Sequence, residues 1–245
     1  MGAPRRALIL NGFYVTDVQE AVISGFRLKL SETRAYPRNA GVTVEYQLIA
    51  DPGGEPGNVM PISMRFSISA LPSEPMPPRW SDERVGYFNT VFVDLGDHRS
   101  VREGRNSDLL DTQVTLINRR RMAVNSDPLT YYVDPSVPSE WREYIRTGVE
   151  SWRPAFAAAG LGDEAIRAVL PGEEAFPEDY DAGDIRFNSI TWAVDVDQVF
   201  ALGPATIDPR TGEILHSGIV FTDGWIRSWS TAFEIYGDST DSPSR

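Results

Sequence analysis

The sequence predicts an α+β fold, with an antiparallel β region in the N-terminal half and a mixed sheet with one long helix in the C-terminal half. In the first half, apolar and polar side chains alternate in several short stretches, as they do in strands with one buried face. In the second half, apolar residues recur at three- and four-residue steps, as in an amphipathic helix. The chain has 245 residues, of which 41% are hydrophobic and 24% charged, so it can bury one large core or two smaller ones.

Three antiparallel strands are expected between residues 21 and 69. Alternating apolar residues mark these strands around residues 26–30, 42–48 and 64–68. Residues 51–58 are rich in proline and glycine, which indicates a loop between the second strand and the third. The three strands are therefore predicted to form a meander with one buried face.

A proline-rich strap follows this region and leads to two further strands. Four prolines within residues 71–78 exclude both a helix and a central strand there. Strands are expected again over residues 87–93 and 112–117. The polar stretch that ends at Pro128 predicts a domain boundary, which gives an N-terminal domain over residues 1–126.

Residues 139–159 show the clearest helical pattern in the chain. The apolar residues that recur at this spacing are Trp141, Tyr144, Ile145, Val149, Trp152 and Phe156. Pro154 interrupts the pattern, because it lacks the amide that would bond to Glu150 and its ring crowds that carbonyl. A kink near Trp152 or an early end of the helix is expected.

Four strands complete the second half, over residues 129–133, 185–192, 199–207 and 214–221. Residues 208–213 are expected to join the last two strands as a hairpin, with glycine where a positive φ is favoured. Residues 127–236 are therefore predicted to form a second domain, in which the helix crosses one face of a mixed sheet. Residues 237–245 contain few apolar side chains and are expected to be a disordered tail.

Composition argues against several classes of function. The 35 acidic and 23 basic residues give a formal net charge of −12, which disfavours nucleic-acid binding. The dense basic run at residues 119–121 is expected to be a solvated or interface turn rather than a phosphate site. No apolar stretch reaches the roughly 18 residues of a transmembrane segment. The absence of cysteine excludes a disulfide scaffold, a thiolate metal site and a cysteine nucleophile.

The residues that usually bind metals or catalyse hydrolysis are sparse. The only histidines, His98 and His216, lie far apart and outside any His-Glu-x-x-His motif, so no metal ligand and no catalytic residue is predicted. The carboxylates of residues 172–184 are dense enough for a calcium site, but their spacing fits no EF-hand loop, which favours a solvated acidic loop. Hydrolysis by a pair of carboxylates stays open, although no pair stands out.

Three longer runs, at residues 76–88, 131–160 and 203–214, resemble a family of large zinc metalloproteases. These are metzincin-like proteins related to the matrixins, with an N-terminal domain of unknown function. The resemblance extends roughly over residues 21–229. It implies that residues 127–236 form the upper half of a zincin-like domain and that the preceding residues form a mostly β region.

The resemblance also implies roles for individual segments. Residues 139–159 would be the backing helix, and residues 184–187 would be the central strand. The edge strand that pairs with an extended substrate would comprise Val199, Phe200, Ala201, Leu202, Gly203, Pro204 and Ala205.

The zinc-binding motif of this family is missing from the sequence. The motif would follow Trp229, but no His-Glu-x-x-His is present, so no residue inherits the role of zinc ligand or general base. No cofactor is therefore expected in this chain, whereas zinc is expected in the full-length family. The chain is predicted to be a fragment that lacks the catalytic half.

Three functional hypotheses stay open. In the first, the chain is a metallopeptidase fragment that is inactive by itself and acts on extended peptides or proteins only when complete. In the second, it is a non-catalytic module that binds peptides at its sheet edge. In the third, it is a structural domain. Without the zinc helix, one sheet face would be exposed, and the apolar residues expected on it are Ile185, Phe187, Val220 and Phe221. A missing C-terminal half or a partner is expected to cover that face.

Overall fold

The computed structural model describes residues 9–10, 13–14, 26–50, 58–93, 113–124, 126–194 and 201–236. The chain divides into two compact units, residues 1–69 and residues 70–245. The division therefore lies at the start of the proline-rich strap rather than near residue 126. Within the described ranges, no helix has the length and apolarity needed to cross a bilayer. The expected tail at residues 237–245 lies outside the described residues.

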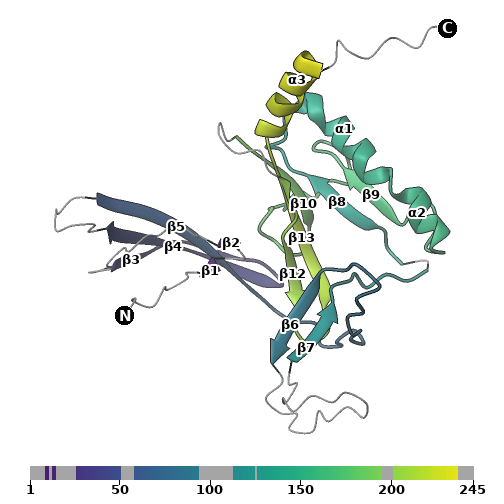
Figure 1. Cartoon of the computed structure of the whole chain (residues 1–245), viewed down its shortest axis with the longest axis horizontal. Coiled ribbons are helices and arrows are strands. Elements are labelled where there is room, and N and C mark those ends of the chain that lie inside the picture. The colour runs from purple at the N-terminus through teal and green to yellow at the C-terminus, as the bar shows by residue number, and fades with distance from the viewer. Residues whose placement is uncertain are drawn as a thin grey trace. The chain divides into compact units, whose positions relative to one another are not determined.

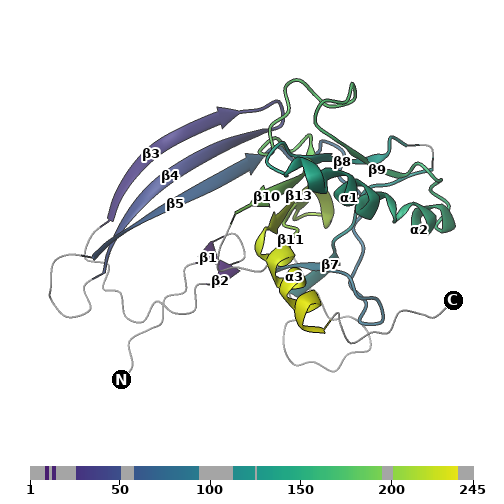
Figure 2. The same cartoon turned by 90° about the horizontal axis from the view of Figure 1, so that it is seen from above.

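The first unit contains an antiparallel three-stranded sheet, as predicted. Its strands are β3 (Phe26–Ala35), β4 (Asn39–Ala50) and β5 (Asn58–Ser69), in that order, and Figure 2 shows that they curve along their length. A short pair that was not predicted, β1 (Ile9–Leu10) and β2 (Phe13–Tyr14), precedes them.

The apolar face of this sheet is more exposed than predicted. The strand register aligns Leu30, Val44 and Met64 in one row across the sheet. However, the exposed fractions of Leu30 and Ile68 are 62% and 67%. The prediction of one buried face is wrong for these residues, because the sheet is a single layer and no described element of this unit packs on it.

The second unit contains a mixed sheet, which confirms the α+β fold class. Its strands are β8 (Leu129–Val133), β9 (Ile166–Val169), β10 (Asn188–Ala193), β11 (Ala201–Leu202), β12 (Ala205–Asp208) and β13 (Glu213–Thr222). The order across the sheet is β11-β13-β10-β8-β9, and β12 also pairs with β13. The neighbouring strands β13, β10, β8 and β9 are parallel to one another, whereas β11 and β12 run antiparallel to β13.

The start of β10 differs from both predictions made for it. Residues 184–187 form a turn rather than the implied central strand, because the Phe187 N–H donates to the Asp184 carbonyl at 3.1 Å. The Arg186 guanidinium also bonds to the Asp184 carboxylate. These bonds hold the chain in a turn, so the strand begins at Asn188. The neighbouring β9 was not predicted at all.

Three helices lie in the described part of the second unit. The predicted interruption at Pro154 is confirmed, since α1 (Ser139–Glu150) ends before it and Pro154 lies in the first turn of α2 (Arg153–Ala158). A third helix, α3 (Gly224–Tyr236), was not predicted. Figure 1 shows α1 and α2 alongside β8 and β9, and α3 continuing from the end of β13.

The two faces of the mixed sheet are covered differently. On the α1 face, a core of Val133, Val137, Ala168 and Leu170 packs against Trp141, Ile145, Val149 and Trp192. On the opposite face, the ring of Tyr132 contacts the rings of Phe176 and Phe187 edge to face. Residues 171–187 thus cover the second face through aromatic packing.

This coverage overturns the expected exposure of the sheet. Ile185 and Phe187 are only 5% and 8% exposed, and Val220 and Phe221 are half-buried. The prediction of an exposed face is therefore wrong for Ile185 and Phe187, which are buried. Ile185 and Phe187 belong to the loop that follows β9 and packs on the second face, whereas Phe221 lines a groove on the α1 face.

A β-hairpin and the proline-rich strap complete the second unit. The strands β6 (Asn89–Val93) and β7 (Gln113–Ile117) pair antiparallel and confirm the two predicted strands. As predicted, residues 71–78 form neither a helix nor a strand. Arg119 and Arg121 hold the strap by donating to the carbonyls of Pro77 and Glu74, each at 2.8 Å.

We expect Gly212→Ala to destabilise the second unit by about 3 kcal/mol, because its φ of 74° is strained for alanine and the new Cβ would clash with the Ile117 carbonyl. As a matched control, Gly148→Ala lies inside α1 with open space at the Cβ position and should stabilise by about 1 kcal/mol. Urea unfolding measures both changes. Equal effects of the two variants would contradict this placement of the turn.

Candidate functional site

One edge of the mixed sheet is closed by side chains. At β9, the Ile166 carbonyl accepts a hydrogen bond from Arg153 Nε at 3.1 Å. Two residues further on, the Ala168 N–H donates to Glu150 Oε1 at 3.4 Å. Arg153 and Glu150 also form an ion pair with each other. Helix side chains therefore occupy backbone groups that another strand would need for pairing.

The opposite edge of the sheet is open among the described residues. In the part of the chain that the structure describes, β11 and β12 have no neighbouring strand other than β13. Ala201, Gly203 and Ala205 are exposed along this edge. No described side chain hydrogen-bonds to the backbone of Gly203 or Ala205. This edge can accept a further strand.

The direction of the free backbone groups follows from one hydrogen bond. The Gly218 N–H donates to the Pro204 carbonyl at 3.0 Å, so Pro204 faces β13. Backbone groups alternate in direction along an antiparallel pair, and Gly203 and Ala205 therefore direct their N–H and C=O groups outward. The break between β11 and β12 falls at Gly203 and Pro204, because proline offers no N–H to β13.

The hairpin that carries this edge is fixed by two ion pairs. Asp208 is fully buried, and the Arg210 guanidinium bonds to both of its carboxylate oxygens. Arg210 thereby lowers the pKa of Asp208, and it also donates to the Pro72 carbonyl. At the other end of the turn, Glu213 accepts two bonds from Arg121, each at 2.8 Å. Both ends of the turn next to the edge are thus tied to the rest of the unit by charged hydrogen bonds.

The structure places five of the seven predicted edge residues on this open edge. Ala201 and Leu202 form β11, Gly203 and Pro204 make the break, and Ala205 begins β12. Val199 and Phe200 lie outside the described residues.

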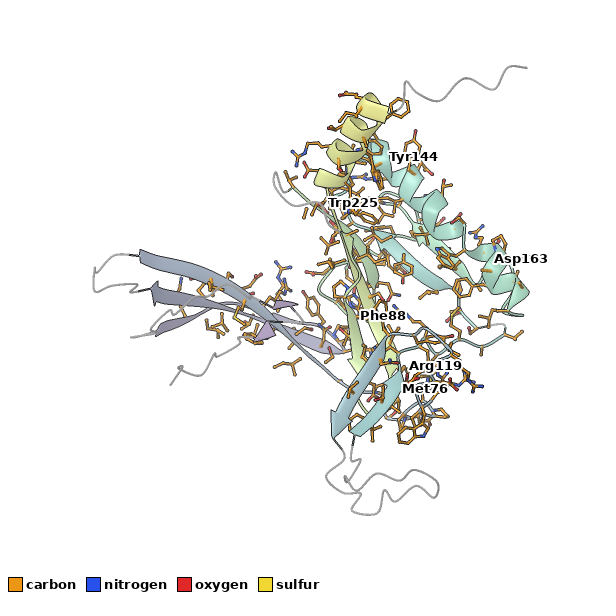
Figure 3. All side chains as sticks on the ribbon, viewed as in Figure 1. Met76, Phe88, Arg119, Tyr144, Asp163 and Trp225 are labelled. Carbon is orange, nitrogen blue, oxygen red and sulfur yellow. The ribbon has the colours of Figure 1, made fainter. Side chains whose placement is uncertain are left out.

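An apolar groove crosses the α1 face of the sheet beside this edge. Its volume is about 730 Å³. The floor comes from β8, β10 and β13, and the walls come from α1, α2 and α3. In Figure 3, Tyr144 of α1 and Trp225 of α3 lie at the same end of the unit, and both line the groove. Sequence analysis missed α3, although its Trp225, Ile226 and Trp229 show helical spacing.

The acidic loop is structural rather than a metal centre in the described residues. Glu173 pairs with Arg146, while Asp179 and Asp184 both pair with Arg186. The prediction of a solvated loop fits Asp179 but is wrong for Asp184, which is fully buried. Within the described ranges, no three or more metal-binding side chains gather at one place.

The basic run at residues 119–121 is not simply a solvated turn. Arg119 joins β13 through backbone bonds to Gly212 and Ile214. Arg120 extends one guanidinium nitrogen to Asn188 Oδ1 and Ser217 Oγ, each at 2.7 Å. The run therefore serves as an internal connection within the second unit.

His216 is a half-buried side chain on β13, whereas His98 lies outside the described residues. Burial lowers the pKa of His216, and the charge of Arg120 lowers it further. A hydrogen bond with the Phe187 backbone and the charge of Asp184 act in the opposite direction. Its Nε2 is buried and has no hydrogen-bond partner among the described residues. The neutral imidazole is therefore the stable form in the fold.

Comparison with known proteins gives a match for part of the chain only. Residues 11–106 match a family model described as a domain of unknown function, DUF5117. The match includes the sheet of the first unit and reaches β6, but it does not extend to the mixed sheet. The searches against curated proteins and against solved structures found no match.

The stability of the second unit should fall as the pH drops below 6.5, the ordinary pKa of histidine. Because the pKa of His216 is lower in the folded chain, the unfolded chain takes up a proton on this imidazole at a higher pH than the folded chain does. Protonation therefore lowers the free energy of unfolding at acidic pH and leaves it unchanged above 6.5. His216→Gln should reduce this loss. The His216 imidazole should remain neutral below pH 6.5 by NMR, and titration at or above 6.5 would contradict its burial.

Proposed function

We propose that this chain is the peptide-binding portion of a zinc metallopeptidase-type domain, inactive by itself, and that it binds extended peptides along β11 and β12. The observation that carries the proposal is the asymmetry of the mixed sheet. Side chains close the β9 edge, whereas the β11–β12 edge directs outward backbone groups that no described residue pairs with. An extended peptide can pair with these groups by strand addition.

The topology supports the peptidase part of the proposal. The sheet has one antiparallel edge segment next to otherwise parallel strands, and a long helix lies against the opposite part of the sheet. This arrangement agrees with the backing helix and substrate-binding edge that the resemblance implies. The family match to a domain of unknown function over residues 11–106 also fits a β region that precedes such a domain.

Peptide hydrolysis would need groups from outside these 245 residues. A zinc peptidase holds its metal with imidazoles from one helix and uses a neighbouring glutamate to take a proton from the bound water. This sequence has two histidines and no His-Glu-x-x-His motif. We therefore assign this chain the positioning of the peptide, with zinc bound by polypeptide that the chain does not contain.

A second candidate is a peptide-binding module that never cleaves. The same open edge favours it, because strand addition needs no catalytic group. The two candidates differ in what a longer product of the gene does. Zinc-dependent cleavage of a bound peptide by that product supports the first, and binding without cleavage supports the second.

We expect Ala205→Pro to weaken peptide binding about tenfold, which corresponds to about 1.4 kcal/mol. Proline removes the outward N–H of residue 205 and places a ring at the edge, whereas Ala205→Ser keeps the N–H and should bind as the parent does. The parent chain is first tested on an array of extended peptides, and fluorescence anisotropy then compares the variants with the tightest binder. An array without any binder, or equal affinities of both variants, would refute binding at this edge.

The purified chain should contain no stoichiometric zinc after dialysis, because His98 and His216 are assigned no role as ligands. Elemental analysis by mass spectrometry measures the metal content. One tightly bound zinc per chain that is lost in His216→Gln would show that this assignment is wrong.

A further inference from the structure

The apolar groove on the α1 face has no occupant among the described residues. Its lining is dominated by aromatic and aliphatic side chains from three helices and four strands. Several of these side chains are far more exposed than core residues, with exposed fractions of 72% for Tyr144, 63% for Trp152 and 56% for Trp229. A contiguous aromatic surface of this kind is typical of an interaction site.

The groove exists because α1 covers only part of the sheet. The helix packs on β8 and β9, while Ile219 and Phe221 of β13 line the groove instead. Helices pack about 8–10 Å apart, and neighbouring strands lie about 4.8 Å apart, so one helix covers about two strands. The uncovered part, formed by β10 and β13, therefore has room for one further helix.

Next to one end of the groove lies a cation, Arg120, that has no carboxylate partner among the described residues. Tyr131 lines the groove and is aligned across the sheet with Asn188, whose side-chain oxygen accepts a hydrogen bond from Arg120. The described partners of Arg120 are the neutral groups of Asn188 and Ser217. Burial lowers the pKa of Arg120, and no carboxylate contributes to it. By contrast, its neighbour Arg121 is paired with Glu213.

Trp225, a residue of the groove lining, has a donor atom without a partner among the described residues. This donor, Nε1, is buried. A buried N–H without a partner costs about 1–3 kcal/mol, but an atom without accessible surface offers no contact to an occupant of the groove. The polar feature available to an occupant is therefore the cation beside the groove, Arg120.

We propose that the groove is the docking site of an amphipathic α-helix that carries a carboxylate near the end facing Arg120. The apolar lining offers almost no backbone partners, so an extended peptide would leave its own amides and carbonyls unpaired. A helix satisfies these groups internally and presents an apolar stripe to the floor. The carboxylate supplies a negative charge opposite Arg120, whose described partners are all neutral.

The experiment uses the whole chain and an 18-residue probe peptide with leucines on one helical face and glutamine and serine elsewhere. Glutamate, glutamine or lysine is placed near either end of the probe, because the direction of the docked helix is open. Five of the six tryptophans line the groove, so binding should shift their fluorescence to the blue and raise the helical circular dichroism signal. The best glutamate probe should bind at least fivefold more tightly than its lysine counterpart.

Variants separate the groove from the rest of the surface. Trp229→Ser, at an exposed position on the groove wall, should weaken binding at least fivefold, while Trp80→Ser, at a similarly exposed position outside the groove, should not. Arg120→Gln should abolish the preference for glutamate, provided that its thermal melt is unchanged. If that variant fails to fold, Arg120→Lys serves instead and should keep the preference.

Three results would overturn the proposal. One is the absence of a fluorescence shift with every probe, and another is equal binding of the glutamate and lysine probes. The third is binding of sodium dodecanoate with the same fluorescence shift while no peptide binds, which would make the groove an acyl-chain site. Binding of an extended peptide to the β11–β12 edge is tested at Ala205, whereas helix docking in the groove is tested at Trp229. The failure of one proposal can therefore be distinguished from the failure of the other.

Discussion

The mixed sheet depends on where its edge amides and carbonyls find hydrogen-bond partners. These backbone groups must be bonded to protein or water, and an unpaired edge recruits another strand. At β9, Glu150 and Arg153 satisfy the edge from the helix that covers the same strand. At β11 and β12, the described residues supply no such partner. This single difference makes one edge structural and leaves the other available for a ligand.

Short turns with the pattern Asp-x-Arg support that arrangement. In each of three such turns, the carboxylate accepts both the backbone N–H and the guanidinium of the arginine two positions later. Asp184 and Asp208 are fully buried in these pairs, while Asp82 remains exposed. Several arginines of this chain, which has a net charge of −12, thus stabilise turns. The pairs at Asp184 and Asp208 precede β10 and β13, the strands that form the groove floor.

Periodicity in the sequence predicted the elements whose packing is local and regular. The meander of β3 to β5, the strand β13 and the helix break at Pro154 all follow from alternation or from the chemistry of proline. The strand β9 was not predicted, because its four residues are too few to show a clear alternation. The packing of residues 171–187 on the second sheet face was not predicted, because Phe176 and Phe187 lie in an acidic loop. Only the fold shows that their rings contact Tyr132. The hydrogen bond between Arg120 and Ser217 was also not predicted, because the two residues are 97 positions apart in the sequence.

Amide hydrogen exchange tests the asymmetry of the two edges most directly. In the free chain, the amides of Gly203 and Ala205 should exchange rapidly, while that of Ala168, bonded to Glu150, should be protected. Addition of a bound extended peptide should slow exchange at Gly203 and Ala205 and leave Ala168 unchanged. Protection of Gly203 and Ala205 in the free chain, or no change on peptide binding, would contradict an open and functional edge.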